Sequence, residues 1–127
     1  MLLEKIKSPA DVKSLDVKSL EQLAAEMRSA LIKKLSARGG HVGPNLGFVE
    51  ATIALHYVFE SPKDKIVYDV SHQSYSHKML TGRARAFLDA DHYGDVTGYS
   101  EPTESEHDFF MVGHTSTSVS LALGLAT

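Results

Sequence analysis

The apolar positions after residue 18 recur at the spacing of an amphipathic helix. After Ser19 these apolar positions are Leu20, Leu23, Ala24, Met27, Leu31 and Leu35. Ser19 and Gln22 have the form of a capping box, and Gly39 stands where such a helix would stop. The pattern therefore predicts a helix from Ser19 to Gly39. Residues 1–18 mix short apolar pairs with turn-forming residues and are interpreted as a lead-in segment.

A second apolar run follows a loop, residues 38–45, that contains three glycines and a proline. Asn45 at the end of this loop can cap a helix that runs to about Phe59, because Ser61 and Pro62 would end it there. This helix is apolar on nearly every side, which predicts that it is buried.

Shorter signals alternate in the rest of the chain. Residues 65–70 are rich in β-branched side chains and predict a strand, and residues 75–80 predict a short helix that Gly82 stops. Residues 89–108 are acidic and are expected to be mostly loop. Residues 109–112 predict a second strand.

The end of the sequence predicts a further helix. Ser116, Ser120 and Gly124 would form a ridge of small residues on one face, with Leu121 and Leu125 on another. A helix this apolar should be covered by further structure. The sequence is therefore interpreted as part of a larger domain, or as a chain that works with a partner polypeptide.

The composition is that of a single globular domain. The chain has 127 residues, of which 43% are hydrophobic. A net charge of −3 without a cluster of Lys or Arg argues against nucleic-acid binding, and the absence of cysteine excludes disulfide scaffolds and thiolate metal sites. The sequence shows no signal peptide or long apolar run, so we predict a soluble cytoplasmic protein without membrane contacts.

Charge is unevenly distributed. No Lys or Arg follows Arg85, whereas acidic side chains recur through residues 89–108. This segment is either a solvated acidic loop or a carboxylate-rich rim that would repel a phosphorylated substrate.

Three short stretches place a histidine among glycine and small polar residues. They are residues 39–43 with His41, residues 69–73 with His72, and residues 113–118 with His114. Each lies where a predicted helix or strand begins or ends, so its backbone groups are free to bind an anion. Together they indicate a phosphate-bearing cofactor.

Each stretch also has an ordinary structural interpretation. His72 can donate a ring N–H to a phosphate oxygen or satisfy a local carbonyl. Gly113 and the hydroxyls after His114 can open a phosphate-binding helix or simply cap one. His41 can exchange protons from a flexible loop, or its glycines can merely turn the chain. A histidine-dependent metallohydrolase is a further alternative, although no His-Glu-x-x-His pattern occurs and we predict no metal ligands.

In order and separation these stretches resemble the N-terminal part of the 1-deoxy-D-xylulose-5-phosphate synthase family, within the transketolase superfamily. The matching segments are residues 39–41, 49–50, 53–56, 68–75, 77–83, 104–108 and 113–118. The resemblance implies an α/β fold with a parallel sheet and flanking helices. Residues 1–127 would be the N-terminal portion of a thiamine-diphosphate-binding, transketolase-like domain that is incomplete at its C-terminal end.

The resemblance also implies a function. Enzymes of this family are dimers that condense pyruvate with glyceraldehyde 3-phosphate, using thiamine diphosphate and Mg²⁺. By this resemblance His72, Gly113, His114 and Thr115 would hold the cofactor around its diphosphate. His41 would lie near the reacting carbon and assist proton transfer.

The sequence also differs from the family. Glycine is usual where Ser71 stands, serine where Thr115 stands, and basic residues between positions 98 and 104. The Gly-Asp-Gly motif that binds Mg²⁺ in the family does not occur, so those ligands are expected beyond this chain. We therefore expect an N-terminal fragment that is inactive alone. The alternative is a split or non-catalytic subunit that acts with a partner chain.

Overall fold

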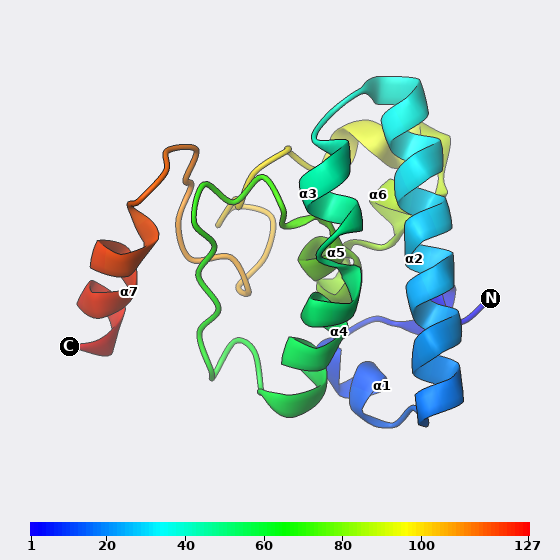
Figure 1. Ribbon diagram of the computed structural model, residues 1–127, viewed down its shortest axis with the longest axis horizontal. Coiled ribbons are helices and arrows are strands. Elements are labelled where there is room, and N and C mark those ends of the chain that lie inside the picture. The colour runs from blue at the N-terminus through cyan, green and yellow to red at the C-terminus, as the bar shows by residue number, and fades with distance from the viewer.

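The longest element of the protein is the helix α2 (Val17–Arg38), against which most of the core packs. In the computed structural model, which describes residues 1–127, α2 and α4 lie side by side with α5 and α6 behind them (Figure 1). The remaining elements are η1 (Leu3–Lys5), α1 (Pro9–Lys13), α3 (Val42–Leu46), α4 (Val49–Val58), α5 (Tyr75–Lys78), the π-turn η2 (Met79–Arg83), α6 (Arg85–Leu88), η3 (Ala90–Asp95) and α7 (Ser118–Ala126).

Helix α2 confirms the predicted helix but begins earlier than Ser19. The carboxylate of Asp16 accepts a hydrogen bond from the Ser19 amide at 2.8 Å, so Asp16 is the N-cap and the proposed capping box at Ser19 is wrong. Gly39 ends the helix as predicted, with a φ of 76° that favours glycine. Leu23 and Leu31, both fully buried, anchor its apolar face in the core.

The second predicted helix is two helices, and it is not buried as expected. Asn45 lies inside α3 rather than capping a helix, because its side chain bonds to residues distant in sequence. Helix α4 buries Val49 and Ile53, whereas Tyr57 and Val58 are exposed. An apolar groove of about 430 Å³ therefore runs between α2 and α4.

The α/β fold class predicted from the sequence is wrong, because the structure contains no strand and no sheet. Residues 65–68 and 109–112 are irregular, and no backbone hydrogen bond joins one to the other. The chain turns sharply after the first of these segments, where Val70 and Ser71 have φ values of 60° and 67°. The β-branched side chains favour extended backbone, but a strand also needs a hydrogen-bonded neighbour.

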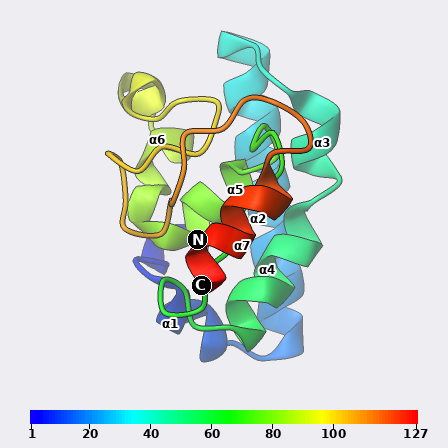
Figure 2. The same cartoon turned by 90° about the vertical axis from the view of Figure 1, so that its left-hand side faces the viewer.

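Helix α7 lies apart from the helices around α2. Irregular segments lie between α7 and those helices in Figure 1, and α7 faces the viewer in Figure 2. None of its residues is buried, and Val119 and Leu123 are exposed. The expected helix therefore forms, but the structure leaves uncovered the faces that the sequence predicted to be covered. No helix has the length and apolar character needed to cross a membrane.

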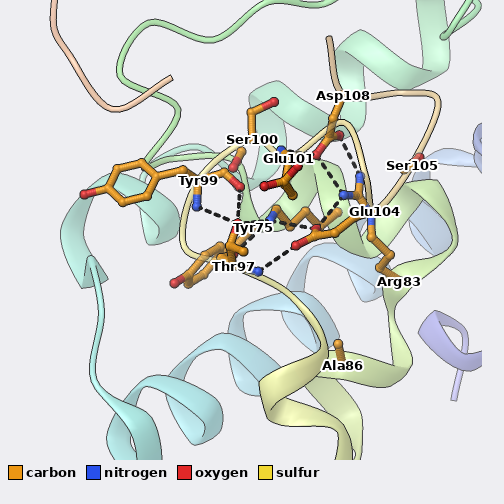
Figure 3. Close-up of polar contacts among 12 residues, drawn as sticks. Tyr75, Arg83, Ala86, Thr97, Tyr99, Ser100, Glu101, Glu104, Ser105 and Asp108 are labelled. Carbon is orange, nitrogen blue, oxygen red and sulfur yellow. Dashed lines mark hydrogen bonds and ion pairs between the residues drawn. The ribbon is translucent and has the colours of Figure 1, made fainter. Parts of the chain in front are cut away.

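The acidic segment is only partly a solvated loop. Glu104 accepts hydrogen bonds from Lys78 and Arg83, both at 2.9 Å, and Arg83 also forms a two-pronged pair with Asp108 at 2.8 Å (Figure 3). The side chains of Lys78 and Asp108 are fully buried. Although burial alone would raise the pKa of Asp108, hydrogen bonds from Arg83 and His77 hold that pKa well below its usual range. These carboxylates thus fix the loop to η2 and do not form a rim.

A buried pair of histidines adjoins this ionic network. His56 Nε2 and His77 Nδ1 are 2.8 Å apart, and His77 Nε2 lies 3.1 Å from Asp108 Oδ1. Burial, with the neighbouring His77 as a smaller cause, lowers the pKa of His56 from 6.5 to about 3. His56 is therefore neutral in the folded protein at pH values where the unfolded chain binds a proton.

This difference makes the folded state sensitive to acid. Between pH 6.5 and about 3 the unfolded state binds more protons than the folded state, so the free energy of unfolding falls as the pH is lowered through that range. The loss from His56 is at most about 5 kcal/mol. We expect His56→Gln to flatten the pH dependence of urea unfolding above pH 4. The control His114→Gln changes an exposed histidine and should leave this pH dependence as it is. An unchanged pH dependence in His56→Gln would contradict the role given to His56.

Candidate functional site

The structure brings two of the three predicted histidines together. His41 lies in the loop before α3, and His72 lies in the turn that follows Ser71. Their ring centroids are 5.0 Å apart, with the planes at 72°, so the edge of one ring meets the face of the other. Two imidazoles from segments far apart in the sequence therefore share one side of the molecule.

The carboxamide of Asn45 holds these two histidines in place. Its Nδ2 donates to the carbonyl oxygens of His41 at 2.6 Å and His72 at 2.9 Å, and its Oδ1 accepts from the amide of Tyr75 at 3.0 Å. Asn45 is fully buried, so these bonds are shielded from water. One side chain thus joins the His41 loop, the His72 turn and the start of α5.

Tyr99 is a member of this cluster that the sequence pattern did not predict. Its ring centroid lies 5.9 Å from that of His41. A β-carbon built on Gly113 would lie 3.9 Å from the Tyr99 ring, so Gly113 abuts it on another side. The sequence offers one weak signal for Tyr99, an aromatic residue next to Gly98 in an otherwise polar loop.

The predicted anion-binding stretch at residues 113–118 divides into two parts. The carboxylate of Asp69 accepts hydrogen bonds from the amides of Ser116 at 3.0 Å and Ser118 at 3.2 Å, and these bonds lower the pKa of Asp69. The amides at the start of α7 are therefore already engaged by a carboxylate of this chain. The backbone amides of residues 113–115, in contrast, make no hydrogen bond within the protein.

His114 and Thr115 are not packed into the cluster. Both are exposed, and no contact joins the ring of His114 to His41 or His72. Of the five predicted site residues, the structure pairs His41 with His72. Gly113 abuts Tyr99, whose ring in turn contacts His41. It leaves the side chains of His114 and Thr115 at the surface.

The arrangement of donors does not favour a metallohydrolase. No group of three His, Asp or Glu side chains is placed so that it could hold a metal ion. The closest histidines, His56 and His77, are both buried and bond to each other. The cluster offers a pair of imidazoles and an aromatic ring, and Gly113, the first of three residues with free backbone amides, abuts that ring. These groups can bind an anion and transfer protons.

Comparison with known proteins gives the family. Residues 3–127 match the family model described as 1-deoxy-D-xylulose-5-phosphate synthase. Curated relatives of that name are 56% identical over 98% of the chain in Listeria welshimeri, 55% over 100% in Shouchella clausii and 53% over 99% in Dictyoglomus turgidum.

The chain therefore belongs to the 1-deoxy-D-xylulose-5-phosphate synthase family, as the sequence resemblance indicated, and matches its N-terminal part. It spans about a fifth of the length of these relatives, since the match covers 20% of each.

The role of Asn45 leads to a prediction. In Asn45→Asp the carboxylate still accepts from Tyr75 but repels the carbonyl oxygens of His41 and His72, which lose their donor. We expect a loss of about 3 kcal/mol in unfolding free energy. We also expect loss of the nuclear Overhauser effect between the two imidazole rings.

The matched control for this variant is Gln73→Glu. That change removes a single bond from a side-chain amide, to the carbonyl oxygen of Asp69 at 3.1 Å, within the same turn. It should preserve the contact between the imidazole rings. Retention of the ring contact in Asn45→Asp would show that Asn45 does not hold the histidines.

Proposed function

We propose that this chain forms part of a thiamine-diphosphate-dependent transferase that condenses pyruvate with glyceraldehyde 3-phosphate to 1-deoxy-D-xylulose 5-phosphate. The observation that carries the proposal is the pairing of His41 with His72 in a chain of this family, with Tyr99 between His41 and the free amide of Gly113. The enzyme would act in the cytoplasm as a homodimer, or this chain would act with a partner chain.

The residues present fit such a cofactor. His72 Nδ1 is buried and has no hydrogen-bond partner, which is costly unless a ligand supplies one. The amides of Gly113, His114 and Thr115 are free to donate to diphosphate oxygens. Magnesium would be held by residues other than these, because no cation-binding group of carboxylates or imidazoles occurs.

Each residue has a distinct role in this proposal. His72 and residues 113–115 bind and orient the diphosphate, and His41 holds or moves a proton near the reacting carbon. Thiamine diphosphate, when bound, supplies the electron sink for the carbon chemistry. Tyr75 limits how closely the His41 loop can approach α5, because its hydroxyl would lie 3.2 Å from a β-carbon built on Gly40.

Cofactor binding can be tested on the isolated chain. Adding thiamine diphosphate should shift the amide resonances of residues 113–115 and the ring resonances of His72. We expect His72→Ala to weaken binding by roughly tenfold or more, since a hydrogen bond to a charged phosphate is lost. His92→Ala, which removes a histidine paired with Asp95 on η3, serves as the control and should bind normally. Equal affinity in the two variants would argue against the assignment of His72.

Turnover needs a different experiment, because the chain spans about a fifth of its relatives. We expect no turnover of pyruvate and glyceraldehyde 3-phosphate by the chain alone, and turnover when it replaces the matching residues of the Listeria welshimeri relative. In that chimera His41→Gln should lower kcat roughly 100- to 10,000-fold, with a smaller change in KM for pyruvate. Full activity of the variant would remove His41 from the proposed chemistry.

A further inference from the structure

Tyr99 reaches His41 on a short loop, residues 97–100, that is fixed at both ends. At its start, Lys78 donates to the Thr97 carbonyl at 2.8 Å and the Thr97 amide donates to Glu104 at 2.7 Å. At its end, the amide of Ser100 donates to Ser71 Oγ at 2.9 Å. Figure 3 shows the Tyr99 ring directed away from the Arg83–Asp108 pair.

The same loop rests on Tyr75 from one side. A β-carbon on Gly98 would lie 3.3 Å from the Tyr75 hydroxyl, and one on Gly40 would lie 3.2 Å from it. The two glycines that precede Tyr99 and His41 therefore abut one hydroxyl group. This shared contact limits how closely the two loops approach, but it does not pull them together.

Ser71 supplies an attractive contact between the loop that carries Tyr99 and the turn that carries His72. It is fully buried, and its hydroxyl donates to the Val112 carbonyl at 2.5 Å while accepting from the Ser100 amide. Ser71 directly precedes His72, so the turn that carries His72 also ties down the loop that carries Tyr99. The φ of 67° at Ser71 is unfavourable for a residue with a side chain, and its two hydrogen bonds offset that strain.

We propose that Tyr99 forms one wall of the site that contains His41 and His72, and that Ser71 is the positioning residue that holds this wall in place. The inference rests on the proposed function only for the ligand that the wall would face. Tyr99 is 37% exposed and would present its ring to a bound cofactor or substrate beside the imidazole of His41. An aromatic ring offers a flat apolar surface, which suits the planar rings of thiamine.

The test compares two variants of Ser71 with a control in the same turn. Ser71→Gly and Ser71→Ala both remove the hydroxyl, but only glycine accepts the positive φ without strain. Ser74→Ala is the control, because Ser74 is equally buried and its hydroxyl bonds within the turn, to the Ser71 carbonyl at 2.7 Å. The measurements are the nuclear Overhauser effects among the His41, His72 and Tyr99 rings and the urea midpoint of unfolding.

We expect both Ser71 variants to lose the contact between His41 and Tyr99 while keeping that between His41 and His72, which Asn45 maintains. Ser74→Ala should keep both contacts, and Ser71→Gly should unfold at a higher urea concentration than Ser71→Ala. Persistence of the Tyr99 contact in Ser71→Gly would overturn the proposal. So would joint loss of both contacts, or a Ser71→Gly chain that does not fold, since Ser71 would then support the fold as a whole.

A titration of the unaltered chain with thiamine diphosphate separates this inference from the proposed function. Shifts of His72 together with the Tyr99 ring resonances would support both. Shifts of His72 without any change at Tyr99 would overturn the role of Tyr99 as a wall and leave the proposed function standing. A chain in which His72 and residues 113–115 do not respond would contradict the proposed function, while the ring contacts would still decide whether Ser71 positions Tyr99.

Discussion

The carboxamide of Asn45 is the interaction on which the candidate site depends. It joins His41 to His72, 27 residues away from Asn45, and to the start of α5, 30 residues away. Each of its polar atoms is paired in a fully buried position, where an unmade hydrogen bond would be costly. No other hydrogen bond joins the loop after α2 to the turn at residues 69–74. Without this amide, nothing of that kind would fix the distance between the two segments.

The turn at residues 69–74 makes the remaining connections. Val70 and Ser71 adopt left-handed backbone, which costs roughly 1–2 kcal/mol for each residue with a side chain. The hydroxyls of Ser71 and Ser74 offset this cost with buried hydrogen bonds, and Asp69 accepts from the amides of Ser116 and Ser118 at the start of α7. Strain in the backbone is therefore balanced by hydrogen bonds within the turn and to residues 112–118, which is common where a loop carries functional groups.

A network of ion pairs supports the loop that carries Tyr99. Arg83 bridges Glu104 and Asp108, and Lys78 links Glu104 to the loop that carries Tyr99. Buried charges contribute little net stability, but they impose one arrangement because any other leaves a charge unpaired. Separately, Asp69 accepts from the amides of Ser116 and Ser118, whereas those of residues 113–115 are free. This arrangement suits a site in which the carboxylate of Asp69 fixes residues 116–118. The free amides of residues 113–115 would then be available to a bound anion.

The sequence alone determined the local features. The spacing of apolar residues predicted α2 and its stop at Gly39, and the motifs around His41 and His72 indicated the family and two residues of the candidate site. Tertiary structure decided the rest. Residues 65–70 and 109–112 have strand-forming composition, but pairing depends on neighbours and the segments do not pair. Asn45 and the acidic residues Glu104 and Asp108 have caps or solvated loops as their commonest roles. They instead bond to partners far away in the chain. Tyr99 reaches His41 because hydrogen bonds to Ser71, Lys78 and Glu104 fix its loop. Periodicity and capping are properties of adjacent residues, whereas these contacts join segments whose meeting is fixed only when the whole chain packs.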